Sequence, residues 1–280
     1  MSASIIDGCA IAQSLKNQLK HEIKAQSQTP TLAVILVGAD PASAIYVKRK
    51  QEACAEVGIH SVFHHLESHA DTQALRHLID SCNRDHTVHG ILLQLPLPEH
   101  INAHELLEAI DPSKDVDGFH PLNLGRLAQK RPLLRPCTPL GIMKLLESTG
   151  VDITGLNATV IGASNIVGRP LALELLLANC SVSIVHRLSQ DLQGHISSAD
   201  ILISATGQRH AFPTTWIKPG AIVIDVGIHR QSNDRVVGDI DFKEASQRAA
   251  FITPVPGGVG PMTVACLLLN TWQAFQLQQA

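Results

Sequence analysis

One short segment combines residue types that could act on a ligand. Ser43, Tyr46 and Lys50 are separated by three and four positions, so on a helix they share one stripe. Tyr46 is the only tyrosine of the chain, and its flat ring and the Lys50 amine could contact one ligand. A lysine can take a proton from water where desolvation and a cationic substrate favour its neutral amine. A polar stripe is also typical of a helix face that meets only solvent.

Polar residues interrupt two other segments. Gln94 lies inside the apolar run 91–97, and a buried amide needs partners that nearby backbone or a ligand could supply. Asp115 and Asp117 follow in the loop KDVDG, but oxygen ligands do not recur there at calcium-loop spacing, so no metal is expected. The segment 254–261, PVPGGVGP, predicts a rigid wall of small residues.

A glycine turn indicates a site for a phosphate. The strand-like run 158–163 leads through Gly162, Ala163 and Ser164 to Gly168 and a leucine-rich helix. A strand, a glycine turn and a helix N-terminus together can hold a pyrophosphate through backbone N–H groups and the helix dipole. The spacing G-x-S-x-x-x-G departs by one residue from the dinucleotide fingerprint, so a turn without a ligand is the alternative interpretation.

Arg187 follows the next predicted strand, where NAD-binding folds carry an acid for the ribose hydroxyls. A carboxylate would repel a 2′-phosphate, whereas a guanidinium can bind it through two hydrogen bonds. The residue therefore favours NADP over NAD, although an arginine at a strand end can also be merely solvated.

Alternating helices and strands must position these residues. The predicted helices are 7–25, 40–57 (begun by Asp40 and Pro41), 71–84, 104–110, 139–148, one ending at 178, 191–198 and 261–278. The predicted strands are 31–38, 59–67, 88–95, 158–163, 181–186, 201–205 and 221–226, and 111–138 is predicted to be a loop. Apolar strands separated by helices favour an α/β fold with two α/β domains, parallel sheets and an interdomain cleft that could bind a ligand.

Composition excludes several classes of protein. Of the 280 residues 45% are hydrophobic but only 3% aromatic, which predicts an aliphatic core. A net charge of −3 offers no basic surplus for a nucleic acid, and no apolar run predicts a membrane span. Six scattered cysteines and an N-terminus without a basic head or an apolar signal segment predict a reduced, cytoplasmic protein. The histidine pairs 65/69 and 100/104 lack an HExxH glutamate, so no metal site is predicted.

Seven segments in order resemble the bifunctional methylenetetrahydrofolate dehydrogenase/cyclohydrolase family of the bacterial type. The matching segments are 42–50 (ASAIYVKRK), 90–98 (GILLQLPLP), 114–118 (KDVDG), 136–141 (PCTPLG), 162–168 (GASNIVG), 224–227 (IDVG) and 253–263 (TPVPGGVGPMT). Any one of them could arise by chance, but seven in the family's order form a specific match through most of the chain.

The resemblance implies oxidation of 5,10-methylenetetrahydrofolate with NADP, then hydrolysis of the methenyl product to 10-formyltetrahydrofolate at the same folate site. It gives Lys50 the central catalytic role, with Gln94 beside it, Tyr46 on the folate rings and Asp117 on the pterin. It places Gly257, Gly260 and Pro261 along the folate cleft, Gly162, Ala163, Ser164 and Ile228 on the dinucleotide, and Arg187 on its extra phosphate. Some family members have an arginine where this chain has Ala163, so Arg187 must carry more of the preference for NADP.

The resemblance also implies how the chain is divided. We expect a folate-binding catalytic domain at 1–137, completed by the C-terminal helix 261–280, and a Rossmann-like, doubly wound NADP-binding domain at 138–260. We expect a homodimer, because relatives are commonly dimeric. Two alternatives are another two-domain dehydrogenase, which would not need Tyr46, Lys50 and Gln94, and a silent folate or NADP sensor, which would not need Lys50.

Overall fold

The computed structural model describes residues 2–231 and 234–279, which form two compact units. Unit 1 comprises the chain up to Ala12 together with Thr138–Thr263. Unit 2 comprises Gln13–Cys137 and the chain from Val264 onward. Both units are α/β structures, so the predicted fold class is confirmed.

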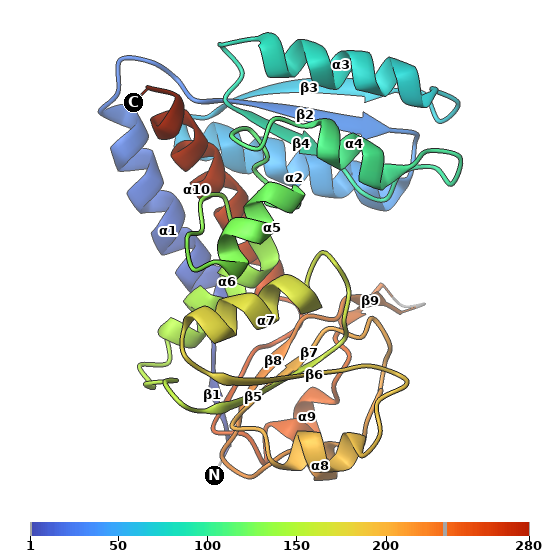
Figure 1. Cartoon of the computed structure of the whole chain (residues 1–280). Coiled ribbons are helices and arrows are strands. Elements are labelled where there is room, and N and C mark those ends of the chain that lie inside the picture. Colours follow the sequence, from blue (N-terminus) through green and yellow to red (C-terminus); the bar gives the residue numbers. More distant parts are fainter. Residues whose placement is uncertain (1, 232–233, 280) are drawn as a thin grey trace. The chain divides into compact units, whose positions relative to one another are not determined.

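Unit 2 is built on a parallel sheet in the order β3-β2-β4. Its strands are β2 (Thr31–Val37), β3 (His60–Leu66) and β4 (Gly90–Leu93). Every residue of β2 is buried, which explains why its sequence TLAVILV shows no polar alternation. Helices α3 (Thr72–Arg84) and α4 (Ala103–Ala109) cover one face of the sheet, while α2 (Pro41–Val57) lies on the other (Figure 1).

The other helices with residues in unit 2 are α1 (Gly8–Lys24), α5 (Pro121–Ala128) and α10 (Val259–Gln279). The unit boundary falls inside both α1 and α10. Within unit 2, the α10 residue Asn270 donates to the carbonyls of Val116 and Arg135, at 2.8 and 2.7 Å. The helix therefore fixes the backbone at Val116, next to Asp117, and at Arg135, two residues before Cys137.

Unit 1 is built on a parallel sheet in the order β1-β11-β8-β7-β5-β6. Its strands are β1 (Ser4–Ile5), β5 (Asn157–Ile161), β6 (Ser181–Val185), β7 (Ile201–Ser204), β8 (Ile222–Asp225) and β11 (Phe251–Ile252). Helix α7 (Gly168–Leu177) lies on one face, and α8 (Leu192–Ser197) and α9 (Phe242–Ala245) lie on the other (Figure 1). The remaining elements are α6 (Cys137–Glu147), the 3-10 turn η1 (Thr214–Trp216) and the antiparallel pair β9 (His229–Arg230) and β10 (Val236–Val237).

One prediction about this fold was wrong. The predicted loop 111–138 contains α5, which starts at Pro121 and is capped by His120, whose ring Nδ1 accepts from Leu122 N at 3.0 Å. Strand β1 was not predicted: it pairs with β11 and extends the sheet of unit 1, so residues 1–12 pack with that unit. This pairing joins residues far apart in the sequence and leaves little local pattern.

Candidate active site

Lys50 and Gln94 meet at the carboxyl end of the small sheet of unit 2. Lys50 is only 9% exposed, and its Nζ donates to Gln94 Oε1 at 3.0 Å. Gln94 follows β4, continues the ladder by donating its N–H to Ile35 O at 2.9 Å, and donates its side-chain amide to Leu95 O at 2.6 Å. The terminal amide of Gln94 is thus held at both its oxygen and its nitrogen. One N–H of the Lys50 amine is committed to Gln94, so the directions of the other bonds on Nζ are restricted.

Helix α2 places Lys50 on its buried stripe rather than on a solvated one. Ser43 and Val47 are buried on the same stripe, two turns and one turn before Lys50. Asp40 caps the helix as predicted, because its Oδ2 accepts from Ser43 N at 2.8 Å and from Ser43 Oγ at 2.7 Å. Tyr46 stands beside this stripe and is 38% exposed. Its ring is therefore open to a ligand, one turn from the buried amine.

The KDVDG segment divides its charged residues between support and the candidate site. The buried Lys114 ammonium donates to three carbonyls at the C-terminal end of α3, those of Cys82, Asn83 and Asp85, at 2.7 to 3.0 Å. Asp115 is 1% exposed and accepts from the backbone N–H groups of residues 119 and 120 and from the amide of residue 123. These two residues hold the loop, which leaves Asp117 as its functional candidate.

Asp117 is a partly buried carboxyl beside Lys50. Burial raises its pKa, while the nearby Lys50 ammonium and the Cys137 thiol act in the opposite direction. Burial also raises the pKa of Cys137 well above that of an ordinary thiol, so this cysteine stays neutral. Cys137 donates to Val116 O at 3.2 Å, the carbonyl that also accepts from Asn270. Asn270 was missed in the sequence, although an asparagine inside the apolar run LLLNTWQAF was a signal of the same kind as Gln94.

The glycine turn of unit 1 is closed too tightly for any side chain at two positions. A Cβ on Gly162 would overlap the Ala205 carbonyl, and one on Gly168 would overlap the Gly162 carbonyl. Ser164 Oγ accepts from the N–H groups of Val167 and Gly168 at 3.2 and 3.3 Å. This hydroxyl therefore satisfies the backbone N–H of the first residue of α7 and of the residue before it. Backbone N–H groups can therefore approach a ligand closely, which is the geometry that binds a pyrophosphate.

The other predicted cofactor residues lie along the same edge of this sheet. Gly162 N donates to Val185 O at 2.8 Å, so the turn adjoins the end of β6, where Arg187 is exposed. Ala163 O accepts from the Arg169 guanidinium at 3.1 Å, a contact that stiffens the turn. Ile228 follows β8 and is 51% exposed. A tight glycine turn, an exposed cation and an exposed apolar residue on one edge fit a phosphorylated dinucleotide.

The small-residue segment 254–261 also belongs to unit 1. Gly257 has a φ of +105°, and its carbonyl accepts from Cys9 N at 3.1 Å. Gly260 and Pro261 are partly buried in the first turn of α10. The segment is therefore anchored against the start of α1.

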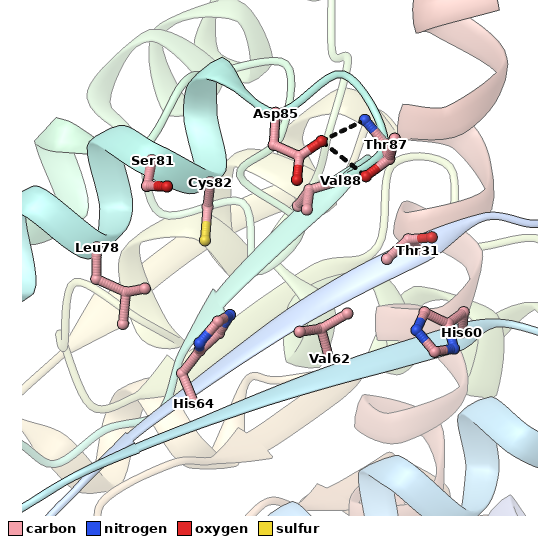
Figure 2. Close-up of a pocket in the computed structure, with 10 residues that line it drawn as sticks. All are labelled: Thr31, His60, Val62, His64, Leu78, Ser81, Cys82, Asp85, Thr87 and Val88. Carbon is pink, nitrogen blue, oxygen red and sulfur yellow. Dashed lines mark hydrogen bonds between the residues drawn. The ribbon is translucent and has the colours of Figure 1, made fainter.

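A cavity of about 340 Å³ lies on unit 2 between β3 and the C-terminal half of α3 (Figure 2). His60 and His64 project into it from one face of β3, separated by Val62, and Asp85 accepts two hydrogen bonds from Thr87 at its rim. Its lining includes none of the predicted site residues. Across residues 2–231 and 234–279 no group of three or more histidine, cysteine or acidic side chains has the arrangement of a metal site.

No helix within the described part of the chain has the length and apolar character needed to span a membrane. The predicted strand character of the histidine-rich segment is confirmed, because His64 and His65 lie in β3. Successive residues of a strand point to opposite faces, so these neighbours cannot act as a pair. His65 instead bonds Gly38 O at 2.8 Å.

Comparisons with known proteins agree with a catalytic site in unit 2 and a dinucleotide site in unit 1. The family model of the tetrahydrofolate dehydrogenase/cyclohydrolase catalytic domain matches residues 6–117, and that of its NAD(P)-binding domain matches residues 136–279. A solved bifunctional methylenetetrahydrofolate dehydrogenase/cyclohydrolase from Campylobacter jejuni is 47% identical, with 99% of each chain covered and a TM-score of 0.96. The enzyme from Trypanosoma brucei, complexed with NADP cofactor and inhibitor, is 36% identical (TM-score 0.94; 99% of this chain and 98% of that one). A silkworm (Bombyx mori) 5,10-methylenetetrahydrofolate dehydrogenase is 41% identical over 99% of both chains, with a TM-score of 0.93.

A dinucleotide-binding sheet in one unit and a buried lysine–glutamine pair in the other define a two-domain, dinucleotide-dependent enzyme. The chain belongs to the tetrahydrofolate dehydrogenase/cyclohydrolase family. It carries both domains of that family and is a bifunctional enzyme, so the predicted family and activity are confirmed. The catalytic and NAD(P)-binding models meet between residues 117 and 136, whereas the packing of α10 assigns the chain from Val264 to unit 2.

Proposed function

We propose that this enzyme oxidises 5,10-methylenetetrahydrofolate with NADP and hydrolyses the methenyl product to 10-formyltetrahydrofolate, with Lys50 as the reacting base. The observation that carries this proposal is the buried Lys50 Nζ, 3.0 Å from Gln94 Oε1 and beside Asp117. A buried amine bound to a neutral amide and placed near a carboxyl is suited to exchanging protons with a bound molecule. A mere binding protein would not need such a group.

In the hydrolysis, a water oxygen bonds to the methenyl carbon as Lys50 takes a proton from that water. Because Gln94 Oε1 holds one N–H of the amine, the lone pair of nitrogen is directed away from Gln94 and can face the water. The C–N5 bond then breaks as the Lys50 ammonium returns its proton to N5. The carbinol hydroxyl releases its own proton to solvent as its C=O bond forms, which leaves the formyl group on N10.

In the oxidation, positioning dominates, since transfer of a hydride needs no proton carrier from the protein. The chemistry that bound NADP would supply is acceptance of the hydride from the methylene carbon. Asp117 would accept hydrogen bonds from the amino and ring N–H groups of the pterin, and the exposed ring of Tyr46 would cover the folate rings. Gly257, Gly260 and Pro261 would supply the small-residue wall expected along folate.

On the cofactor side, Gly162, Ala163 and Ser164 would hold the pyrophosphate through the backbone, and Ile228 would contact the nicotinamide half. Arg187 would bind the 2′-phosphate, because an exposed guanidinium at the end of β6 can form two charged hydrogen bonds with it. NADP should therefore be preferred to NAD even though Ala163 offers no second cation.

The test is an assay of methylenetetrahydrofolate with NADP or NAD that follows reduced cofactor and methenyl product separately. We expect reduction of NADP at a clearly higher kcat/KM than NAD, and decay of added methenyltetrahydrofolate well above its spontaneous rate without any dinucleotide. Equal use of both dinucleotides would contradict the role of Arg187. Failure to accelerate methenyl decay would contradict the cyclohydrolase assignment.

We further propose that the enzyme is a cytoplasmic homodimer whose product feeds purine biosynthesis. All six cysteines are free thiols, as suits a reducing compartment. Strand β3 forms an edge of its sheet and exposes 41% of Phe63, so a second copy could pair there. Light scattering should give twice the mass of the chain, and Phe63→Glu should lower it, with Phe242→Glu in unit 1 as the exposed-phenylalanine control; a monomeric wild type would overturn this proposal.

A further inference from the structure

Two buried carboxylates lie at the carboxyl edge of the unit 1 sheet, and the site described above uses neither. Asp225 ends β8 and is 5% exposed, and Asp239 follows β10 and is 1% exposed. Asp225 Oδ1 accepts from the backbone N–H groups of Gly227 and Asp239 at 2.9 and 3.0 Å, and its Oδ2 accepts from Ile240 N at 2.9 Å. Asp225 thus fixes the backbone before and after the antiparallel pair β9–β10.

Asp239 joins two loops that follow neighbouring strands. Its Oδ2 accepts from Ser204 Oγ at 3.0 Å, from Thr206 N and Oγ1 at 2.9 and 2.8 Å, and from Gly207 N at 3.3 Å. Its Oδ1 lies 2.7 Å from His229 Nε2. One carboxylate therefore ties the loop after β7 to the loop after β8, and His229 is its only partner from the second loop among the described residues.

The order of the strands indicates which half of a dinucleotide would lie over these loops. Along the edge the sequence is β8-β7-β5-β6, with the glycine turn after β5 and Arg187 after β6. With the pyrophosphate at the turn and the 2′-phosphate at Arg187, the adenosine half covers β6, so the nicotinamide half extends over β7 and β8. Ile228, 51% exposed, lies there between Gly227, held by Asp225, and His229, held by Asp239.

We infer that His229 and Asp239 form a positioning pair that holds Ile228 and the Ser204–Gly207 loop in the conformation that binds the nicotinamide half of NADP. Neither side chain needs to touch the reacting atoms. The inference rests on the proposed placement of NADP, with Arg187 at the adenosine end. It predicts that loss of the pair weakens binding of the whole dinucleotide but not of its adenosine half.

Three single variants separate this role from a general structural one. His229→Ala removes the donor to Asp239, His229→Gln keeps an N–H near the position of Nε2, and His195→Ala removes a partly buried histidine from α8 as a control. Dissociation constants are measured by titration with NADP and, separately, with adenosine 2′,5′-bisphosphate. Hydrolysis of methenyltetrahydrofolate without dinucleotide reports whether the rest of the protein is intact.

We expect His229→Ala to raise the NADP dissociation constant about 10- to 100-fold, the equivalent of one lost hydrogen bond to a charged group. His229→Gln should recover most of this loss, His195→Ala should bind like the wild type, and all three should keep the affinity for adenosine 2′,5′-bisphosphate and the rate of hydrolysis. Unchanged NADP affinity in His229→Ala would overturn the inference, as would an equal loss of both ligands or no recovery in His229→Gln. If Arg187→Ala leaves adenosine 2′,5′-bisphosphate binding intact, the proposed placement of NADP is wrong, whatever His229 does.

Discussion

Replacing Lys50 by methionine removes the amine of the candidate site while keeping an unbranched, apolar stem of similar length. Gln94 Oε1 loses its donor at 3.0 Å, and Asp117 loses the nearby cation that opposes the effect of burial on its pKa. If Lys50 is the general base, hydrolysis of the methenyl substrate should slow by about 10²- to 10⁴-fold. That loss corresponds to roughly 3 to 5 kcal/mol in the activation free energy.

The same substitution should cost much less in stability. The lost hydrogen bond to a charged donor is worth about 1.5 to 3 kcal/mol, and the desolvation of a 9%-exposed ammonium, which methionine avoids, offsets part of it. We expect a folded protein that still binds tetrahydrofolate, because Tyr46 and Asp117 remain. Activity and stability should therefore separate clearly.

The assay is the decay of methenyltetrahydrofolate absorbance at saturating substrate, corrected for spontaneous hydrolysis, alongside a tetrahydrofolate titration and a urea unfolding curve. Lys48→Met is the matched control, since Lys48 is an exposed lysine two residues earlier on α2. A Lys50→Met enzyme that hydrolyses within about tenfold of the wild type, below the range for a lost general base, would refute the reasoning.

Three further predictions concern unit 1. Arg187→Ala should raise the dissociation constant for NADP about 10- to 100-fold and leave NAD almost unchanged, as titration would show; equal losses would contradict the phosphate contact. Gly168→Ala forces a Cβ onto the Gly162 carbonyl and should destabilise unit 1 by about 1 to 3 kcal/mol, measured by urea unfolding through Trp216 fluorescence in a Trp272→Phe background. Its control is Gly125→Ala in α5, where the added methyl meets open space; a loss no larger than that control's would contradict the tight turn. Burial raises the pKa of Asp225 from 3.8 to about 6, so its stabilising effect is complete below about pH 3.8 and is lost as the pH rises through 6. The unfolding free energy of the wild type relative to Asp225→Asn should fall by roughly 1.4 kcal/mol between about pH 5 and about pH 7.5, and a rising or flat difference would contradict that shift.

Local signals made much of this enzyme predictable. Asp40 and Pro41 mark the start of α2 because the cap forms within one turn, and the apolar run of β2 reports burial on both faces of a parallel sheet. Gln94 was identifiable because an amide inside an apolar strand must be bonded. The same reasoning applied to Asn270 and Asp225, each a polar residue at the end of or within an apolar run, would have revealed the supports of both sites.

Other features depend on contacts that a local pattern does not contain. Strand β1 exists only through its pairing with Phe251 and Ile252. Helix α5 is capped by a histidine ring, which is outside the usual set of capping residues. The stripe of Ser43, Tyr46 and Lys50 could be predicted, but which of its members would be buried depended on how α2 packs on the sheet.

The supports of Asp117 have a consequence for synthesis of the chain. Asn270 holds the Val116 and Arg135 carbonyls, and Trp272 donates to Glu22 at 2.8 Å, so unit 2 is completed by α10. All of Thr138–Thr263 is translated before Asn270 and Trp272, so unit 1 gains its continuous segment first. On a ribosome the catalytic unit must therefore wait, with the Val116 carbonyl beside Asp117 lacking its donor from α10, until α10 has been made. Deletion of residues 264–279 should harm the folate half of the enzyme and spare the dinucleotide half.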